Sequence, residues 1–161
     1  MSKQVRAELI TEIQHAVAHF QHLNDLFDAA AAELFGVNRT DLLLIGLLGV
    51  HGPQTAGELA AGASLSPAAT TTAIDRIVRA GHAVRRRGEH DKRQTVVVLT
   101  PGAEKLTRRI YSTIADEGRE QLEEYSDRDL RVIHGFLLRG HEVLERNEKR
   151  LRAKRGGDLG A

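Results

Sequence analysis

Two helix-start signals followed by two short predicted strands constrain this chain more than any other feature. Residues 55–58, Thr-Ala-Gly-Glu, form a capping box, in which the threonine and glutamate side chains each bond a backbone amide of the other. A Ser-Pro pair then predicts a second helix over residues 66–80, because serine caps a helix and proline suits its first position. Residues 82–87 and 94–99 are typical of two strands joined by a charged tip. This order of elements is the winged helix-turn-helix arrangement.

Long amphipathic segments flank this core. Residues 5–34 repeat apolar side chains at helical spacing without proline or glycine, and residues 40–50 are apolar on nearly every side, as in a central buried helix. Two further helices are predicted after Thr100-Pro101 and Ser126. Their apolar seams are too long for one small domain to cover, which suggests a homodimer.

The sequence therefore predicts a mostly α fold with a small β-hairpin: a winged helix-turn-helix core plus long terminal dimerisation helices. We expect a single domain over residues 1–161, with the core at 40–100, dimerisation helices at 1–36 and 101–152, and a flexible tail at 153–161.

Charge is unevenly distributed along a chain whose formal net charge is only +1. Between residues 76 and 93, seven basic residues stand against two acidic ones, a local charge of +5. The first 34 residues carry two basic and five acidic residues, or −3. This asymmetry suggests one surface built for an anionic partner.

Several classes of protein are disfavoured by what the sequence lacks. It has no cysteine, which excludes disulfides and thiol-based redox sensing. It shows no signal peptide and no apolar run long enough to span a bilayer, so we expect a cytoplasmic protein with no membrane partner. Phosphate-binding loops, nucleophile elbows and paired carboxylates are absent, so we expect no enzymatic activity and no cofactor.

The helix predicted over residues 66–80 has an inward arc and an outward arc. The inward arc is formed by Thr70, Ile74, Ile77 and Val78. The outward arc suits a DNA major groove, because small side chains allow close approach, threonine reaches base edges and arginine meets phosphates. The candidate DNA-binding residues on this helix are Ser66, Ala68, Ala69, Thr71, Thr72, Arg76 and Arg79. An ordinary solvated helix face is the alternative interpretation.

The tip of the predicted hairpin holds Asp91, Lys92 and Arg93. An arginine at such a tip can enter a minor groove, where the potential is most negative in narrow tracts. We expect Asp91 to pair with a nearby arginine and hold its orientation. A charged hairpin without a partner is the alternative.

Residues 65–106 resemble the core signature of MarR-family transcriptional regulators. The matching positions, in order and spacing, are Asp75-Arg76, Gly81, Arg85, Asp91-x-Arg93 and Leu99-Thr100. The resemblance implies an obligate homodimer with a recognition helix at 66–80, a wing at 82–99 and terminal helices at the dimer interface. It also implies binding of palindromic double-stranded operator DNA, and release when a small aromatic or anionic effector binds. The position of Thr72 often carries a larger polar or basic residue in the family, so operator preference cannot be carried over.

Three histidines, His15, His19 and His22, fall on one row of the first predicted helix. Histidines four residues apart can share a metal ion, but the row spans about 10 Å along the axis, so one ion cannot take all three. We expect no metal site here. The row is either a polar surface or dimer seam, or the lining of an effector pocket that meets an acidic ligand.

The function predicted is a sequence-specific DNA-binding transcriptional regulator, a ligand-responsive homodimeric repressor of a pseudo-palindromic operator. The alternative is a winged-helix protein-interaction module, which would show an exposed apolar patch in place of a basic face.

Overall fold

The computed structural model describes residues 2–88 and 91–157, which divide into a first unit that ends at Tyr111 and a second that begins at Ser112. The elements in chain order are α1 (Lys3–Phe35), α2 (Arg39–His51), β1 (Gln54–Thr55), α3 (Ala56–Ala63), α4 (Pro67–Arg79), β2 (Ala83–Arg87), β3 (Thr95–Leu99), α5 (Pro101–Glu123) and α6 (Asp127–Gly157). This is the mostly helical winged helix-turn-helix fold that the sequence predicts.

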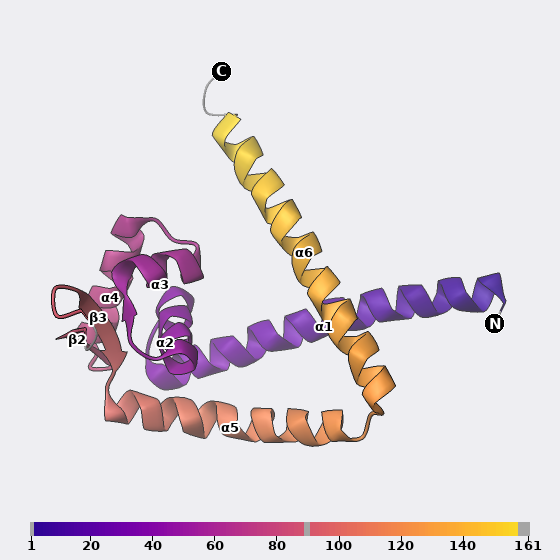
Figure 1. Cartoon of the computed structure of the whole chain (residues 1–161), viewed down its shortest axis with the longest axis horizontal. Coiled ribbons are helices and arrows are strands. Elements are labelled where there is room, and N and C mark those ends of the chain that lie inside the picture. The colour runs from indigo at the N-terminus through magenta and orange to yellow at the C-terminus, as the bar shows by residue number, and fades with distance from the viewer. Residues whose placement is uncertain (1, 89–90, 158–161) are drawn as a thin grey trace. The chain divides into compact units, whose positions relative to one another are not determined.

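Helices α2, α3 and α4 and the strands gather at one end of α1 (Figure 1). Gly36 ends α1: this residue takes a left-handed φ of 65° and its amide bonds back to the last turn of the helix. Only the end of α1 joins the core, through buried Ala31, Ala32 and Phe35. The chain then turns into α2, which Asn38 caps through its side-chain oxygen.

Helix α2 lies at the centre of the first unit, as predicted. Leu42, Leu44, Ile45 and Leu48 are buried there, while Leu43 and Val50 are exposed. The core continues through Leu59 of α3 and through Ile74 and Ile77 of α4, all at most 1% exposed. The helices and strands of the first unit thus pack around one apolar cluster, and the first turns of α5 also pack against it.

Both predicted helix starts are present. Glu58 and Thr55 form the reciprocal capping box of α3, with the Thr55 amide donating to the Glu58 carboxylate at 2.7 Å. The Ser66 hydroxyl accepts from the amide of Ala69 at 3.2 Å, and Pro67 is the first residue of α4. The helix ends at Arg79, one residue before the predicted end.

The sheet has three strands rather than the two predicted, in the order β1-β3-β2. The hairpin pairs Ala83 with Leu99 at its base and Arg87 with Thr95 near its tip. The two-residue strand β1 pairs with β3 on the other side. The tip of the hairpin is closed by two bonds: the amide of Gly88 donates to the Gln94 carbonyl at 2.9 Å, and the amide of Gln94 donates to the Asp91 carbonyl at 3.0 Å.

The second unit contains the rest of α5 and all of α6, joined by a turn at Glu124–Ser126. Helix α6 continues to Gly157, whereas we expected a flexible tail from residue 153; residues 158–161 lie outside the described part of the chain. No single described helix is both long and apolar enough to cross a membrane, although α1 and α2, bent by 90° at their junction, pass that test together on length and composition.

Candidate nucleic-acid interface

The outward face of α4 is the centre of the candidate interface. Four inward residues, Thr70, Ala73, Ile74 and Ile77, are buried and fix which side of the helix faces solvent. The predicted residues exposed on this helix and at its cap are Ser66, Ala68, Ala69, Thr71, Thr72 and Arg79. Arg76 alone among the predicted helix residues is partly buried.

Arg76, which is partly exposed, pairs with the buried Asp41 of α2. The Arg76 Nε donates to both carboxylate oxygens, at 2.9 and 3.1 Å, and its Nη2 donates to Oδ1 at 2.6 Å. The Asp41 side chain is only 4% exposed, while that of Arg76 is 37% exposed. These hydrogen bonds raise the pKa of Arg76 above its usual range, so the guanidinium stays charged at physiological pH. The pair joins the central helix to α4 and fixes the rotation of the outward face.

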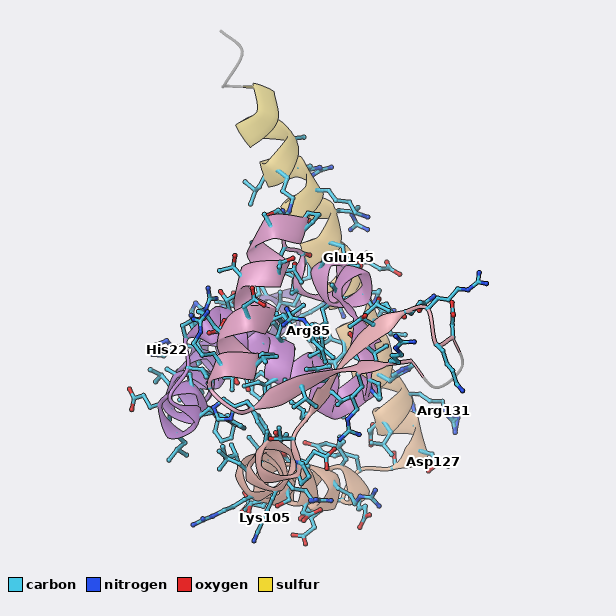
Figure 2. The ribbon with its side chains drawn as sticks, turned by 90° about the vertical axis from the view of Figure 1, so that its left-hand side faces the viewer. His22, Arg85, Lys105, Asp127, Arg131 and Glu145 are labelled. Atoms are coloured by element: carbon cyan, nitrogen blue, oxygen red, sulfur yellow. The ribbon has the colours of Figure 1, made fainter. Side chains whose placement is uncertain are left out.

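A second ion pair joins α4 to the hairpin. The Arg85 Nη2 of β2 lies 2.5 Å from the Asp75 Oδ1 of α4. Figure 2 shows Arg85 on the hairpin that extends past α4. Both partners are roughly half exposed, so the bond gives orientation more than stability. It also neutralises the only carboxylate of α4, on a face where a free negative charge would repel phosphates.

The wing formed by β2, β3 and their connection presents exposed basic side chains. Arg86 and Arg87 of β2 and Lys92 and Arg93 of the tip are exposed. We expected Asp91 to pair with an arginine side chain; its Oδ1 instead accepts from the backbone amide of Arg93 at 2.9 Å. The carboxylate therefore shapes the turn that carries Arg93, as aspartates commonly do. Glu89 and His90 lie outside the described residues.

The predicted effector histidines lie on the exposed part of α1. His15, His19 and His22 are all exposed, and Figure 2 shows His22 at the surface of that helix. No group of three or more histidine, aspartate or glutamate side chains within the described ranges is arranged to hold a metal ion. Further along α1, the ring of Phe27 packs edge-on against Tyr111 of α5 at 5.5 Å. Burial, followed by the charge of Asp28, raises the pKa of the Tyr111 phenol.

Comparison with known proteins decides the family. A family model described as MarR family matches residues 35–94. The chain is also 30% identical over 127 residues to YcgE, an uncharacterised HTH-type transcriptional regulator of Bacillus subtilis (strain 168). The aligned region covers 79% of this chain and 82% of that protein. The chain belongs to the MarR family. It is thus a member of a family of transcriptional regulators.

Solved structures agree with this assignment at the level of the fold. The MarR-family chain is similar to a MarR family protein from Bacillus stearothermophilus, with a TM-score of 0.59 and 21% identity over 90% of this chain and 99% of that one. It is also similar to reduced AbfR bound to DNA, with a TM-score of 0.51 and 20% identity over 89% of this chain and 99% of that one.

The sequence analysis did not predict the two ion pairs that position this interface. These are the pair of Asp41 with Arg76 and the pair of Asp75 with Arg85. One signal was present for Asp41: a carboxylate inside a helix predicted to be buried needs a cationic or hydrogen-bonding partner. Its position in the first turn of α2, where acids are favoured by the helix dipole, concealed that requirement.

Proposed function

We propose that this MarR-family protein is a ligand-responsive homodimeric repressor that binds a pseudo-palindromic operator through α4 and the wing. The observation that carries the proposal is the exposed outer face of α4, held by ion pairs on both sides and next to a basic hairpin. Acting on an operator also requires residence with the DNA in the cytoplasm.

In this proposal α4 enters the major groove, with the wing over the neighbouring minor groove. Ala68, Ala69, Thr71 and Thr72 face the base edges, and the cap residue Ser66 meets a phosphate. Arg79 has no ion-pair partner among the described side chains, which leaves it to contact the backbone. We assign Arg76 to positioning instead of phosphate contact, because its Nε and Nη2 donate to Asp41.

The wing supplies the second set of contacts. Lys92 and Arg93 are exposed at its tip, and the bond from Asp91 to the Arg93 amide fixes the local turn. An arginine presented in this way fits a narrow minor groove, where the negative potential is strongest. The pair between Asp75 and Arg85 sets the angle between the wing and α4.

Exposed apolar side chains support the homodimer. They occur on α1, on the second half of α5 and on α6, and examples are Leu9, Phe20, Ile114, Phe136 and Leu144, each at least 44% exposed. Exposed apolar surface on this scale marks an interaction surface in a soluble protein. A two-fold dimer would place two α4 helices about one turn of DNA apart, which requires a pseudo-palindromic operator.

Ligand response and repression are proposed from the resemblance to the MarR family. An effector releases DNA only if it prefers a dimer geometry that no longer matches the operator spacing. The exposed His15, His19 and His22 are candidates to meet an anionic effector. His19→Ala should blunt release by an aromatic carboxylate more than it changes DNA affinity; equal release of both proteins would remove the histidines from the proposal.

Selection of bound fragments from random duplex DNA by the purified protein tests the function. We expect enrichment of one symmetric sequence, bound with an affinity that falls steeply as salt increases. The alternative is a protein-interaction module, and it predicts no enriched sequence and weak, salt-insensitive binding.

A further inference from the structure

The threonines on the outer face of α4 have no free hydrogen-bond donor. The Thr71 hydroxyl donates to the Pro67 carbonyl at 3.0 Å, and the Thr72 hydroxyl donates to the Ala68 carbonyl at 3.0 Å. A hydroxyl has a single proton, so each keeps only acceptor lone pairs for a ligand. The same bond holds the side chain in one rotamer, which fixes the position of its methyl group.

The two charged side chains of this helix nearest to Thr72, Asp75 and Arg76, are paired with other residues. Arg76 donates to Asp41, and Asp75 accepts from Arg85. Residues 66–79 contain no asparagine, glutamine or lysine. Arg79 lies seven residues beyond Thr72, about 10 Å along the helix axis.

This inventory limits which bases the first half of α4 can recognise. Guanine is read in the major groove by paired donors from arginine or lysine, and adenine by asparagine or glutamine. Residues 66–75 supply neither set of groups, and the nearest arginine, Arg76, turns its Nε and Nη2 toward Asp41. The remaining base feature that an alkyl group recognises is the 5-methyl of thymine, which threonine and alanine contact through their own methyls.

Thr72 is the residue best placed to make that contact. It follows buried Thr70 by two residues, which is about 200° around a helix, so it points almost directly away from the core. Ala68 stands one turn before it on the same side and leaves room for a base edge to approach. Thr71 lies to one side of this line and is exposed as well.

We propose that Thr72 is a specificity-determining residue that recognises a thymine in each half-site through contact between its Cγ2 methyl and the thymine 5-methyl. The inference rests on the proposed DNA-binding function. A 5-methylcytosine at the same place presents the same methyl group and satisfies Thr72 equally well.

The test replaces single thymines of the selected operator, symmetrically in both half-sites, by deoxyuridine, which lacks only the 5-methyl. Burial of one methyl group corresponds to about a four-fold change in affinity per half-site. We expect the wild type to lose affinity by this factor when deoxyuridine replaces thymine at one position of the half-site. Thr72→Ser, which keeps the hydroxyl but removes the methyl, should bind both DNAs equally, while Thr72→Val should still discriminate.

Thr11→Ser is the matched control, because Thr11 is an exposed helical threonine of α1 with the same type of bond, from its hydroxyl to the Ala7 carbonyl. This variant should discriminate as the wild type does. Discrimination that survives in Thr72→Ser, or a wild type indifferent to uracil at every position, would overturn the inference while leaving the DNA-binding function in place. Failure to select any sequence would instead overturn the proposed function.

Discussion

Alanine substitutions at Arg76 and Arg79 should affect different properties, although these arginines lie one helical turn apart on α4. The first should lower the stability of the fold, and the second should weaken DNA binding. Arg76 donates three hydrogen bonds to Asp41, whereas Arg79 is exposed and has no ion pair with a described side chain. We therefore expect Arg76 to stabilise the fold and Arg79 to contact phosphate.

The magnitude for the first variant follows from the burial of Asp41. Its side chain is only 4% exposed, so Arg76→Ala leaves a buried carboxylate without its partner. Breaking a fully buried pair costs about 3–5 kcal/mol, and water that reaches the partly exposed site reduces this to about 3 kcal/mol. At about 2–4 °C per kcal/mol for a chain of this size, the melting temperature should fall by about 6–12 °C.

Thermal melting at one fixed protein concentration, followed by operator titration at several salt concentrations, separates the two roles. Arg79→Ala should melt within about 0.5 kcal/mol of the wild type. It should reduce the slope of log affinity against log salt by about 0.9 for each protomer, because one phosphate contact is lost. Adding Asp41→Asn to Arg76→Ala should restore part of the lost stability, because the unpaired charge is removed.

Two outcomes would contradict these roles of Arg76 and Arg79. If Arg76→Ala melts like the wild type and loses salt dependence, its guanidinium contacts phosphate in the complex and the pair with Asp41 is dispensable. If the added Asp41→Asn gives no recovery, the loss in the single variant does not come from an unpaired carboxylate.

Three further predictions concern the wing, the assembly and the cap of α3. Arg93→Ala should weaken operator binding by about 1–3 kcal/mol without changing the melting temperature; unchanged affinity in a titration at physiological salt would exclude the wing as a minor-groove reader. The melting temperature of the full chain should rise with protein concentration, because the dimer is more stable than its separate protomers. Truncation after Tyr125 should give an unfolded or aggregated product in chromatography, and a stable folded monomer would argue against the dimer. Bonds from Thr55 lower the pKa of Glu58, so wild type should be more stable than Glu58→Gln at neutral pH, with the difference lost as pH falls through that lowered pKa; a difference in melting that does not change with pH would contradict this.

Local signals made most of the helical framework predictable from the sequence. The capping box at Thr55 and Glu58 and the Ser66-Pro67 start act within a few residues, so the sequence shows them directly. Strand β1 could not be predicted in this way. It has only two residues, and its pairing with β3 depends on partners more than 40 positions away, such as Gln54 with Val97.

Long-range contacts also explain what was missed at the candidate interface. Exposure of Thr71, Thr72 and Arg79 follows from helical periodicity, because the inward residues of α4 recur at helical spacing. The partnership of Asp41 with Arg76 joins residues 35 positions apart, and only the packing of α2 against α4 brings them together. A periodic pattern places Arg76 near the outward face but says nothing about which partner holds its charge.

Tethered cleavage of bound DNA locates α4 and the wing on the operator, because the chain has no cysteine and a single introduced thiol is therefore unique. An iron chelate would be attached to Ala69→Cys on α4 or to Lys92→Cys at the wing tip, and cleavage mapped on the selected operator. We expect cuts from α4 in the middle of each half-site, with cuts from the wing in the adjacent minor groove about half a turn, or about 5 base pairs, away. Cuts spread evenly along the DNA from both probes, or no cuts from either, would show that α4 and the wing are not the DNA-binding surface.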